Sequence, residues 1–156
     1  MASRGHFFEG TTIKALLIAN AGRTTDTNFV SVVLPALAMS NALIVVPSKK
    51  CPLLATDFYQ IFETSDLPPG AINIVTGEPD TLAEVLANHD DIEALWYFGS
   101  SEGSKMVEEA SAGNMKRTWV NYGHNRDWFD PKQTIEDKEF LREATHVKNI
   151  WIPYGE

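Results

Sequence analysis

The chain has 156 residues, of which 44% are hydrophobic, and it carries a formal net charge of -8 with a sequence pI of about 4.9. This length is typical of one compact domain, and the acidic balance argues against nucleic acid or an anionic membrane surface as a partner. No apolar run approaches the ~18 residues of a spanning helix, and the first ten residues lack the apolar core of a secretory signal. The single cysteine, Cys51, fits a reducing compartment, so we expect a cytoplasmic protein.

Apolar runs alternate with helical patterns along most of the chain. The runs predicted as strands are Ile13–Asn20, Ala42–Val46, Ile72–Val75, Glu93–Phe98 and Lys116–Val120. The helical patterns between them are Asp26–Met39, Leu53–Thr64, Asp80–Ala87 and the segment after Ser100 that carries Met106, Val107 and Ala110. Short strands separated by helices imply a parallel sheet covered on both faces, with right-handed crossovers. The expected fold class is therefore α/β with an open parallel sheet.

Local signals mark the starts of these helices and assign most aromatic residues to the core. We expect Asp26 or Thr27 to cap the first helix, Pro52 to start the second and Asp80 to cap the third. The aromatic residues expected to pack inside the domain are Phe58, Tyr59 and Phe62 on one helix, and Trp96 and Phe98 on one face of a strand.

The most informative segment runs from Ala94 to Asn125. Its apolar run turns through Gly99 and Ser100 into a helical pattern. The first N–H groups of a helix have no partner within it and carry positive dipole density, so such a turn can hold a phosphate. Gly-Ser is also an ordinary turn, and the segment alone does not decide between the two interpretations.

The order of short motifs around this segment resembles the aldehyde dehydrogenase superfamily. The matching positions are Pro35-Ala36-Leu37-Ala38, Asn41, Pro47-Ser48, Pro52-Leu53, Leu67-Pro68-Pro69-Gly70, Asn73, Val75, Gly77, His89, Phe98-Gly99-Ser100, Lys116 and Gly123. The resemblance covers residues 13–125 and implies a Rossmann-like, dinucleotide-binding half of that family. We therefore expect an unassigned leader at 1–10, a Rossmann-like domain at 11–125 and a C-terminal tail at 126–156.

The resemblance also implies that the catalytic groups of the family are missing, so no catalytic residue is assigned. The family's nucleophilic cysteine belongs to a second domain, for which the 31 residues after Asn125 are too few. Its general-base glutamate falls on Asn121, and an amide cannot take a proton near neutral pH. Its oxyanion-binding asparagine falls on Arg23. We expect this chain alone to be inactive.

Cofactor contacts are reduced in the same way. The lysine and glutamate that hold the adenosine ribose in the family correspond to Val46 and Lys49, and the glycine pair after the third strand becomes Gly77-Glu78-Pro79. The positions that remain for a vestigial cofactor site are Asn20, Ser48, Gly77, Gly99 and Ser100. We expect no bound cofactor, or NAD or NADP held weakly through backbone donors at a helix start. The four histidines are scattered without ligand spacing, so no metal site is predicted.

The C-terminal tail provides a candidate interface. Ile135–Ala144 is predicted as a short helix, and Thr145–Pro153 alternates like a strand with apolar groups on both faces. This ending resembles the final strand of ordinary aldehyde dehydrogenases, which adds to the sheet of a neighbouring subunit. The predicted interface residues are Thr145, Val147, Lys148, Ile150, Trp151 and Ile152. The partner would be a second copy or a catalytic aldehyde dehydrogenase unit, in an oligomer.

Taken together, these features most resemble the inactive C-terminal pseudo-unit of the two-unit branch of the superfamily. One hypothesis is a structural and assembly domain of an active NAD(P)-dependent aldehyde dehydrogenase. A second is an NAD-type nucleotide-binding module without catalysis. A third, an independent enzyme with Ser100 or Cys51 as nucleophile, requires a base that the sequence does not offer.

Overall fold

The computed structural model describes residues 13–17, 26–50, 52–128, 130, 132 and 138–145. The strands are β1 (Ile13–Leu17), β2 (Ala42–Val46), β3 (Ile72–Ile74), β4 (Ile92–Tyr97) and β5 (Arg117–Val120). The helices are α1 (Asp26–Ala38), α2 (Pro52–Glu63), α3 (Pro79–Asn88), α4 (Ser101–Ser111), the 3-10 turn η1 (Ala112–Asn114) and α6 (Glu139–Glu143). Between residues 26 and 120 the ends of the elements agree with the sequence-based bounds to within one residue.

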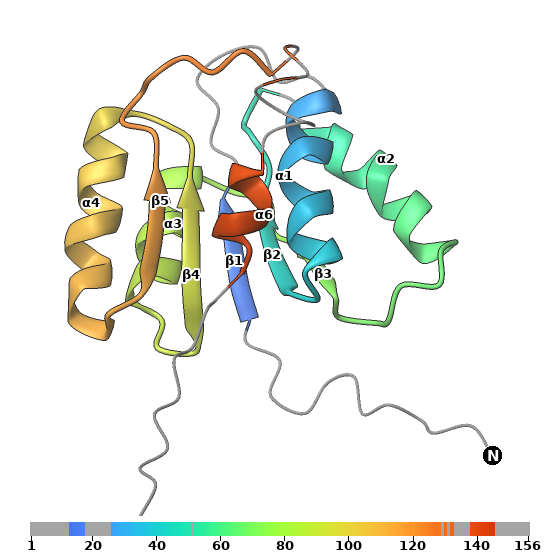
Figure 1. The fold of residues 1–156 in the computed structure, drawn as a ribbon, viewed down its shortest axis with the longest axis horizontal. Coiled ribbons are helices and arrows are strands. Elements are labelled where there is room, and N and C mark those ends of the chain that lie inside the picture. Colours follow the sequence, from blue (N-terminus) through green and yellow to red (C-terminus); the bar gives the residue numbers. More distant parts are fainter. Residues whose placement is uncertain are drawn as a thin grey trace, which may run out of the picture.

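The five strands form one parallel sheet in the order β3-β2-β1-β4-β5 (Figure 1). The chain runs outward from β1 to β3 on one side and from β4 to β5 on the other, so the order reverses between β1 and β4. Leu16 of β1 aligns with Val45 of β2 and with Trp96 of β4. This doubly wound arrangement confirms the expected Rossmann-like α/β fold, in which ligands usually bind at the carboxyl ends of the strands where the order reverses.

One face of the sheet carries an aromatic core. Side chains alternate along a strand, so Trp96 and Phe98 share this face with Leu43 and Val45. α1 and α2 cover it, and the ring centroids of Phe29 and Phe58 lie 4.9 Å apart. The predicted packing role of Trp96, Phe98, Phe58 and Phe62 is confirmed. The prediction for Tyr59 is wrong, because this residue lies on the outer side of α2 and is 47% exposed.

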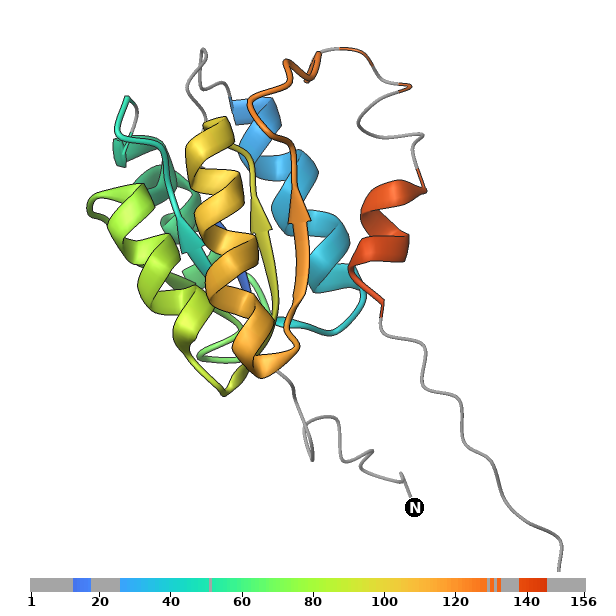
Figure 2. The same ribbon diagram turned by 90° about the vertical axis from the view of Figure 1, so that its left-hand side faces the viewer.

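The opposite face packs against α3 and α4. Val46, Leu95 and Tyr97 are buried there with Ala83 of α3 and Val107 of α4. Figure 2 shows the two layers: α3 and α4 lie on one side of the strands, and α1 and α6 lie on the other. None of the helices in the described part of the chain is long and apolar enough to cross a membrane.

The described residues after 125 join the aromatic face rather than extending away from it. Phe140 of α6 is fully buried, with its ring centroid 5.2 Å from that of Trp119 and 6.1 Å from that of Trp128. The guanidinium of Arg126 lies 4.6 Å from the Phe140 centroid, in cation-π geometry. The side-chain amide of Asn41 donates to the Ala144 carbonyl at 3.0 Å. The division expected at residue 125 stays a prediction, and the core includes residues on both sides of it.

Candidate functional site

The predicted cofactor residues gather at the carboxyl ends of the strands. Ser48 follows β2, Gly77 follows β3, and Gly99 and Ser100 follow β4, so in a parallel sheet all four lie at one edge. Asn20 lies outside the described residues. Ser48 is buried, and its hydroxyl accepts the Lys50 N–H at 3.3 Å. Three of the loops expected to face a dinucleotide therefore meet at the expected edge.

The start of α4 uses its own serines to satisfy its first turn. Ser100 is the N-cap, and its hydroxyl accepts the Gly103 N–H at 3.0 Å. The Ser104 hydroxyl donates to the Ser100 carbonyl at 2.9 Å and accepts the Tyr122 N–H at 3.1 Å. Ser100 therefore acts as a helix cap in this structure, which limits its side chain as a phosphate donor or a nucleophile.

A hydrogen bond between Tyr97 and Asp80 crosses this edge and was not predicted. The Tyr97 hydroxyl donates to Asp80 Oδ1 at 2.7 Å and lies 3.5 Å from Ser100 Oγ. Burial, opposed in part by the Ser100 hydrogen bond and aided by Asp80, raises the pKa of Tyr97, so the hydroxyl stays protonated. The expected N-cap role of Asp80 is wrong. Glu78 precedes the helix without a side-chain cap and Pro79 begins it, so Asp80 is in the first turn and can face Tyr97.

An ion pair occupies the neighbouring loops. Lys49, which replaces the ribose-binding carboxylate of the family pattern, pairs with Glu78 after β3. Both side chains are about half exposed, so the pair contributes little to stability. Glu78 directly precedes α3, whose first turn contains Asp80. Glu102 is a further acidic residue, in the first turn of α4. Lys49 offsets the charge of Glu78, so the acidic residues Asp80 and Glu102 in the first turns of α3 and α4 are the ones that oppose an anionic ligand at this edge.

The loop after β5 holds the position predicted to replace the catalytic base. The Asn121 amide donates to the His124 carbonyl at 3.0 Å, and its Oδ1 accepts the Gly123 N–H at 3.3 Å. Tyr122 and Gly123 both adopt positive φ, and the Tyr122 hydroxyl donates to Glu108 on α4, which raises the Tyr122 pKa. Asn121 therefore closes a turn, and both of its polar side-chain atoms have partners within that turn.

An open pocket of about 430 Å³ lies beside this loop. Its lining residues are Phe98, Trp119, Val120, Asn121, Tyr122, His124, Asn125, Arg126 and Glu139. Arg126 pairs with Glu139 at 3.1 Å, so the charges on its wall are matched. Among the described residues, the lining contains no cysteine, serine or threonine, and Cys51 lies outside the described residues.

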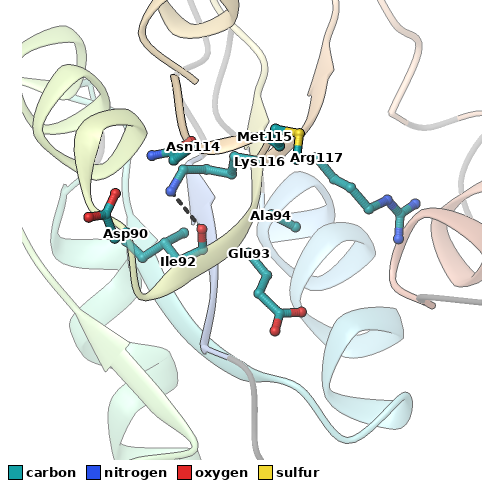
Figure 3. Close-up of a pocket in the computed structure, with 8 residues that line it drawn as sticks. All are labelled: Asp90, Ile92, Glu93, Ala94, Asn114, Met115, Lys116 and Arg117. Carbon is teal, nitrogen blue, oxygen red and sulfur yellow. Dashed lines mark hydrogen bonds between the residues drawn. The ribbon is translucent and has the colours of Figure 1, made fainter. Parts of the chain in front are cut away.

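A smaller pocket of about 160 Å³ lies at the opposite, amino end of β4 and β5 (Figure 3). Its wall includes Lys116, which is 8% exposed and donates from Nζ to the carbonyls of Ile92 at 2.6 Å and His89 at 2.5 Å. Burial lowers the Lys116 pKa, although the nearby Asp90 carboxylate acts in the opposite direction. Since two carbonyls engage the amine, Lys116 ties the turn before β4 to the start of β5 rather than presenting a nucleophile.

The structure describes only the first of the predicted interface residues. Thr145 follows α6, and its carbonyl accepts Arg117 Nη1 at 2.7 Å. Arg117 also pairs with Glu143 and is the first residue of β5, an edge strand of the sheet. Val147, Lys148, Ile150, Trp151 and Ile152 lie outside the described residues. The described chain thus ends beside the amino end of the β5 edge.

The strand order and the covering helices define an α/β domain with a Rossmann-like fold. The aldehyde dehydrogenase family model matches residues 27–129. The chain belongs to the aldehyde dehydrogenase family.

The relatives with established names are much longer than this chain. It is 38% identical over 90 residues to the NADP/NAD-dependent aldehyde dehydrogenase PuuC of Escherichia coli, covering 57% of this chain and 18% of that protein. It is 31% identical over 125 residues to human aldehyde dehydrogenase 1A1, covering 76% of this chain and 25% of that protein. The chain therefore spans only about a fifth to a quarter of the length of these relatives.

Solved structures agree with the fold. An indole-3-acetaldehyde dehydrogenase in apo form superposes with a TM-score of 0.66 at 26% identity, over 74% of this chain and 27% of that one. An aldehyde dehydrogenase of Pseudomonas syringae, solved with NAD+ and octanal, gives 0.61 at 28% identity, over 69% of this chain and 22% of that one. These matches confirm the predicted family and the Rossmann-like fold.

Proposed function

We propose that this chain is a catalytically incomplete domain of the aldehyde dehydrogenase family with a structural and assembly role, in or with an active NAD(P)-dependent aldehyde dehydrogenase. In this role it corresponds to the inactive pseudo-unit of the two-unit branch of the family. The observation that carries the proposal is the carboxyl edge of the sheet. At this edge the Ser100 hydroxyl and the Asn121 amide, which stand where a ligand or substrate would be met, form hydrogen bonds within the chain instead.

Two features of that edge, and one feature of the sequence, support the loss of catalysis. Asn121 stands where the family pattern has its base, and its amide closes a local turn. The Ser100 hydroxyl caps α4. Arg23, at the position of the family's oxyanion-binding asparagine, lies outside the described residues and adds a sequence argument only. A chain with these substitutions has neither a general base nor an activated hydroxyl at the expected place.

The assembly role draws support from the handedness of the crossovers. α4 and α6 lie on opposite faces of the sheet, and the step from β4 to β5 passes over α4. If residues 146–153 formed a parallel strand outside β5 in the same chain, the connection through α6 would have the opposite hand to β4–α4–β5. Such crossovers are right-handed in about 98% of cases. A strand from this segment is therefore better suited to a sheet of another chain.

Catalysis and assembly are tested separately. The full chain is incubated with NAD+ or NADP+ and a series of aliphatic and aromatic aldehydes, and reduced cofactor is followed at 340 nm. We expect no turnover above the protein-free rate. Turnover that Cys51→Ala or Ser100→Ala abolishes would contradict the loss of catalysis.

Assembly is measured by sedimentation equilibrium of the full chain. We expect self-association that Trp151→Ala weakens at least about tenfold, because buried aromatic residues dominate interface energetics. Leu141→Ala, which removes a 42% exposed side chain on α6, serves as the control and should leave association unchanged. A monomeric full chain that also fails to bind an active aldehyde dehydrogenase would contradict the assembly role.

An NAD-type nucleotide-binding module is the alternative. The observation that favours it is the α4 N-terminus at the reversal of strand order, where backbone N–H groups can meet a phosphate. Micromolar NAD+ binding by the full chain in calorimetry would favour this module over the assembly domain.

A further inference from the structure

The edge strand β3 carries features that discourage further strand pairing. It has three residues, and its central Asn73 amide donates to the Leu43 and Gly70 carbonyls. The turn before it contains Pro68 and Pro69, which have no N–H to offer to another strand. Short edges and neighbouring prolines protect a sheet against the addition of a strand. The β3 edge is therefore a poor acceptor.

The other edge strand, β5, lacks this protection. Its residues, Arg117–Val120, include no proline, and the last three are of the β-branched or aromatic types that favour strands. All four are only partly buried. Within the described part of the chain, their backbone groups pair with β4 and with no other element. The outer side of β5 is therefore a candidate acceptor for a further strand.

The described chain ends at the start of this acceptor strand. The Thr145 carbonyl accepts Arg117 Nη1 at 2.7 Å, and Arg117 is the first residue of β5. The segment that follows, 146–153, lies outside the described residues and alternates in sequence like a strand. At about 3.3 Å per residue it is long enough to pair with all of β5. A donor segment thus leaves each chain beside an acceptor edge.

Two copies can combine these parts without a disfavoured connection. Within one chain, a parallel strand outside β5 would require a left-handed crossover through α6. When two β5 edges face each other across a two-fold axis perpendicular to the sheet, they run antiparallel. The Thr145 end of one copy then faces the carboxyl end of β5 in the other, so the segment can add to that strand in antiparallel orientation. Each copy donates and accepts one strand, and the contact closes as a dimer.

We propose that the outer edge of β5 is the docking surface for residues 146–153 of a second copy, in a two-fold dimer that exchanges these segments. The inference rests on the proposed function, because it names the partner and the acceptor of the assembly segment. A second copy fits, since each chain carries both donor and acceptor. Lys148 is the charged residue of the donor segment, and its sign is opposite to the net charge of -8 of the chain that accepts it. Main-chain hydrogen bonds along β5 hold the strand.

Disulfide trapping in the full chain tests this pairing. In a Cys51→Ser background, Thr118→Cys is combined with Lys148→Cys, Asn149→Cys or Ile150→Cys, one at a time. Mild oxidation is followed on non-reducing gels, with the fold checked by circular dichroism. We expect a covalent dimer from at least one of the three pairs, because cysteines on adjacent strands lie within reach of a disulfide.

Asn73→Cys on the β3 edge, combined with the same three substitutions, is the matched control and should give at least tenfold less covalent dimer. A second measurement does not depend on register. Thr118→Lys adds a charge to the β5 edge and should weaken self-association in sedimentation equilibrium at least tenfold, whereas Asn73→Lys should leave it unchanged.

The outcomes separate this inference from the proposed function. Self-association with equal trapping at both edges and no effect of Thr118→Lys would overturn the inference and leave the assembly role standing. Covalent dimer from Thr118→Cys alone would also overturn it, because the two β5 strands would then pair directly. A monomeric full chain that binds an active aldehyde dehydrogenase would overturn only the inference, and one that binds neither partner would overturn both.

Discussion

Residues at the carboxyl end of β4 face two different environments. Trp96 and Phe98 point into the aromatic face, where Trp119 and Trp128 contact them edge-to-face and Phe140 packs against Trp96 in a tilted contact. Tyr97 points the other way, toward α3 and α4, where its hydroxyl contacts Asp80.

The two faces differ in what their residues adjoin: one face holds the aromatic core, and the other borders the carboxyl edge of the sheet. The aromatic face is built from residues as far apart as Phe29 and Phe140, and it is sealed by the part of the chain after residue 125. The α3 and α4 face instead adjoins the carboxyl edge of the sheet, where Tyr97 contacts Asp80 and Ser100 caps α4. Substitutions on the first face should therefore act on folding, and substitutions around Tyr97 should also act on the packing of the first turns of α3 and α4.

The largest effect is expected at Phe140 on the aromatic face. Phe140→Ala removes a fully buried ring and the group beneath Arg126, so we expect the free energy of unfolding to fall by about 3–5 kcal/mol in urea titrations. Leu141→Ala, on the same helix but 42% exposed, should change it by less than about 0.5 kcal/mol. Equal, small effects of both variants would mean that α6 is not part of the core.

A smaller effect on the opposite face is expected for Gly103→Ala. The new methyl group would meet the Tyr97 hydroxyl, so we expect a loss of about 2–3 kcal/mol. Gly113→Ala is the matched control, since nothing lies within 4 Å of a Cβ atom there. The double variant Gly103→Ala with Tyr97→Leu should recover much of the loss, which a thermodynamic cycle measures. Additive effects would contradict the account of why position 103 is glycine.

A third, smaller effect is expected for Lys116, which binds the turn before β4. Lys116→Met keeps the apolar stem but leaves the carbonyls of His89 and Ile92 without their donor, so we expect a loss of about 1–2 kcal/mol. Chemical denaturation at several pH values measures it.

The pH dependence of the same variant tests the burial of Lys116. The pKa of Lys116 is lowered in the folded state, so as pH rises from that lowered value toward the ordinary 10.5 the unfolded chain binds more protons than the folded one. Over this window wild type should gain stability relative to Lys116→Met. A difference that shrinks with rising pH would mean that the fold favours the charged amine.

The smallest effect belongs to the ion pair of Lys49 and Glu78. Lys49→Ala should lower the free energy of unfolding by less than about 0.5 kcal/mol, because both side chains are about half exposed. Lys105→Ala, which removes the exposed pair with Glu109, is the comparison. Both effects should vanish at 1 M salt. A loss above 1 kcal/mol at Lys49 alone would mean that the pair helps to hold the edge of the sheet.

Much of the fold follows from the sequence, because apolar strands and capped helices alternate with little ambiguity between residues 26 and 120. The motifs also singled out Gly99 and Ser100, which lie after β4 at the carboxyl edge of the sheet. The contact between Tyr97 and Asp80 could not be predicted, since it joins the end of β4 to the first turn of α3, and their approach depends on the whole sheet. Asp80 was expected to cap α3 because its position in the sequence suits an N-cap.

The central claim is that this chain retains the framework of a dinucleotide-binding domain without binding a dinucleotide. Calorimetric titration of the full chain with NAD+ tests it most directly. The account predicts no saturable binding tighter than about 1 mM, which corresponds to about -4 kcal/mol. A dissociation constant in the micromolar range, weakened by a substitution at Gly99 or Ser100, would contradict it.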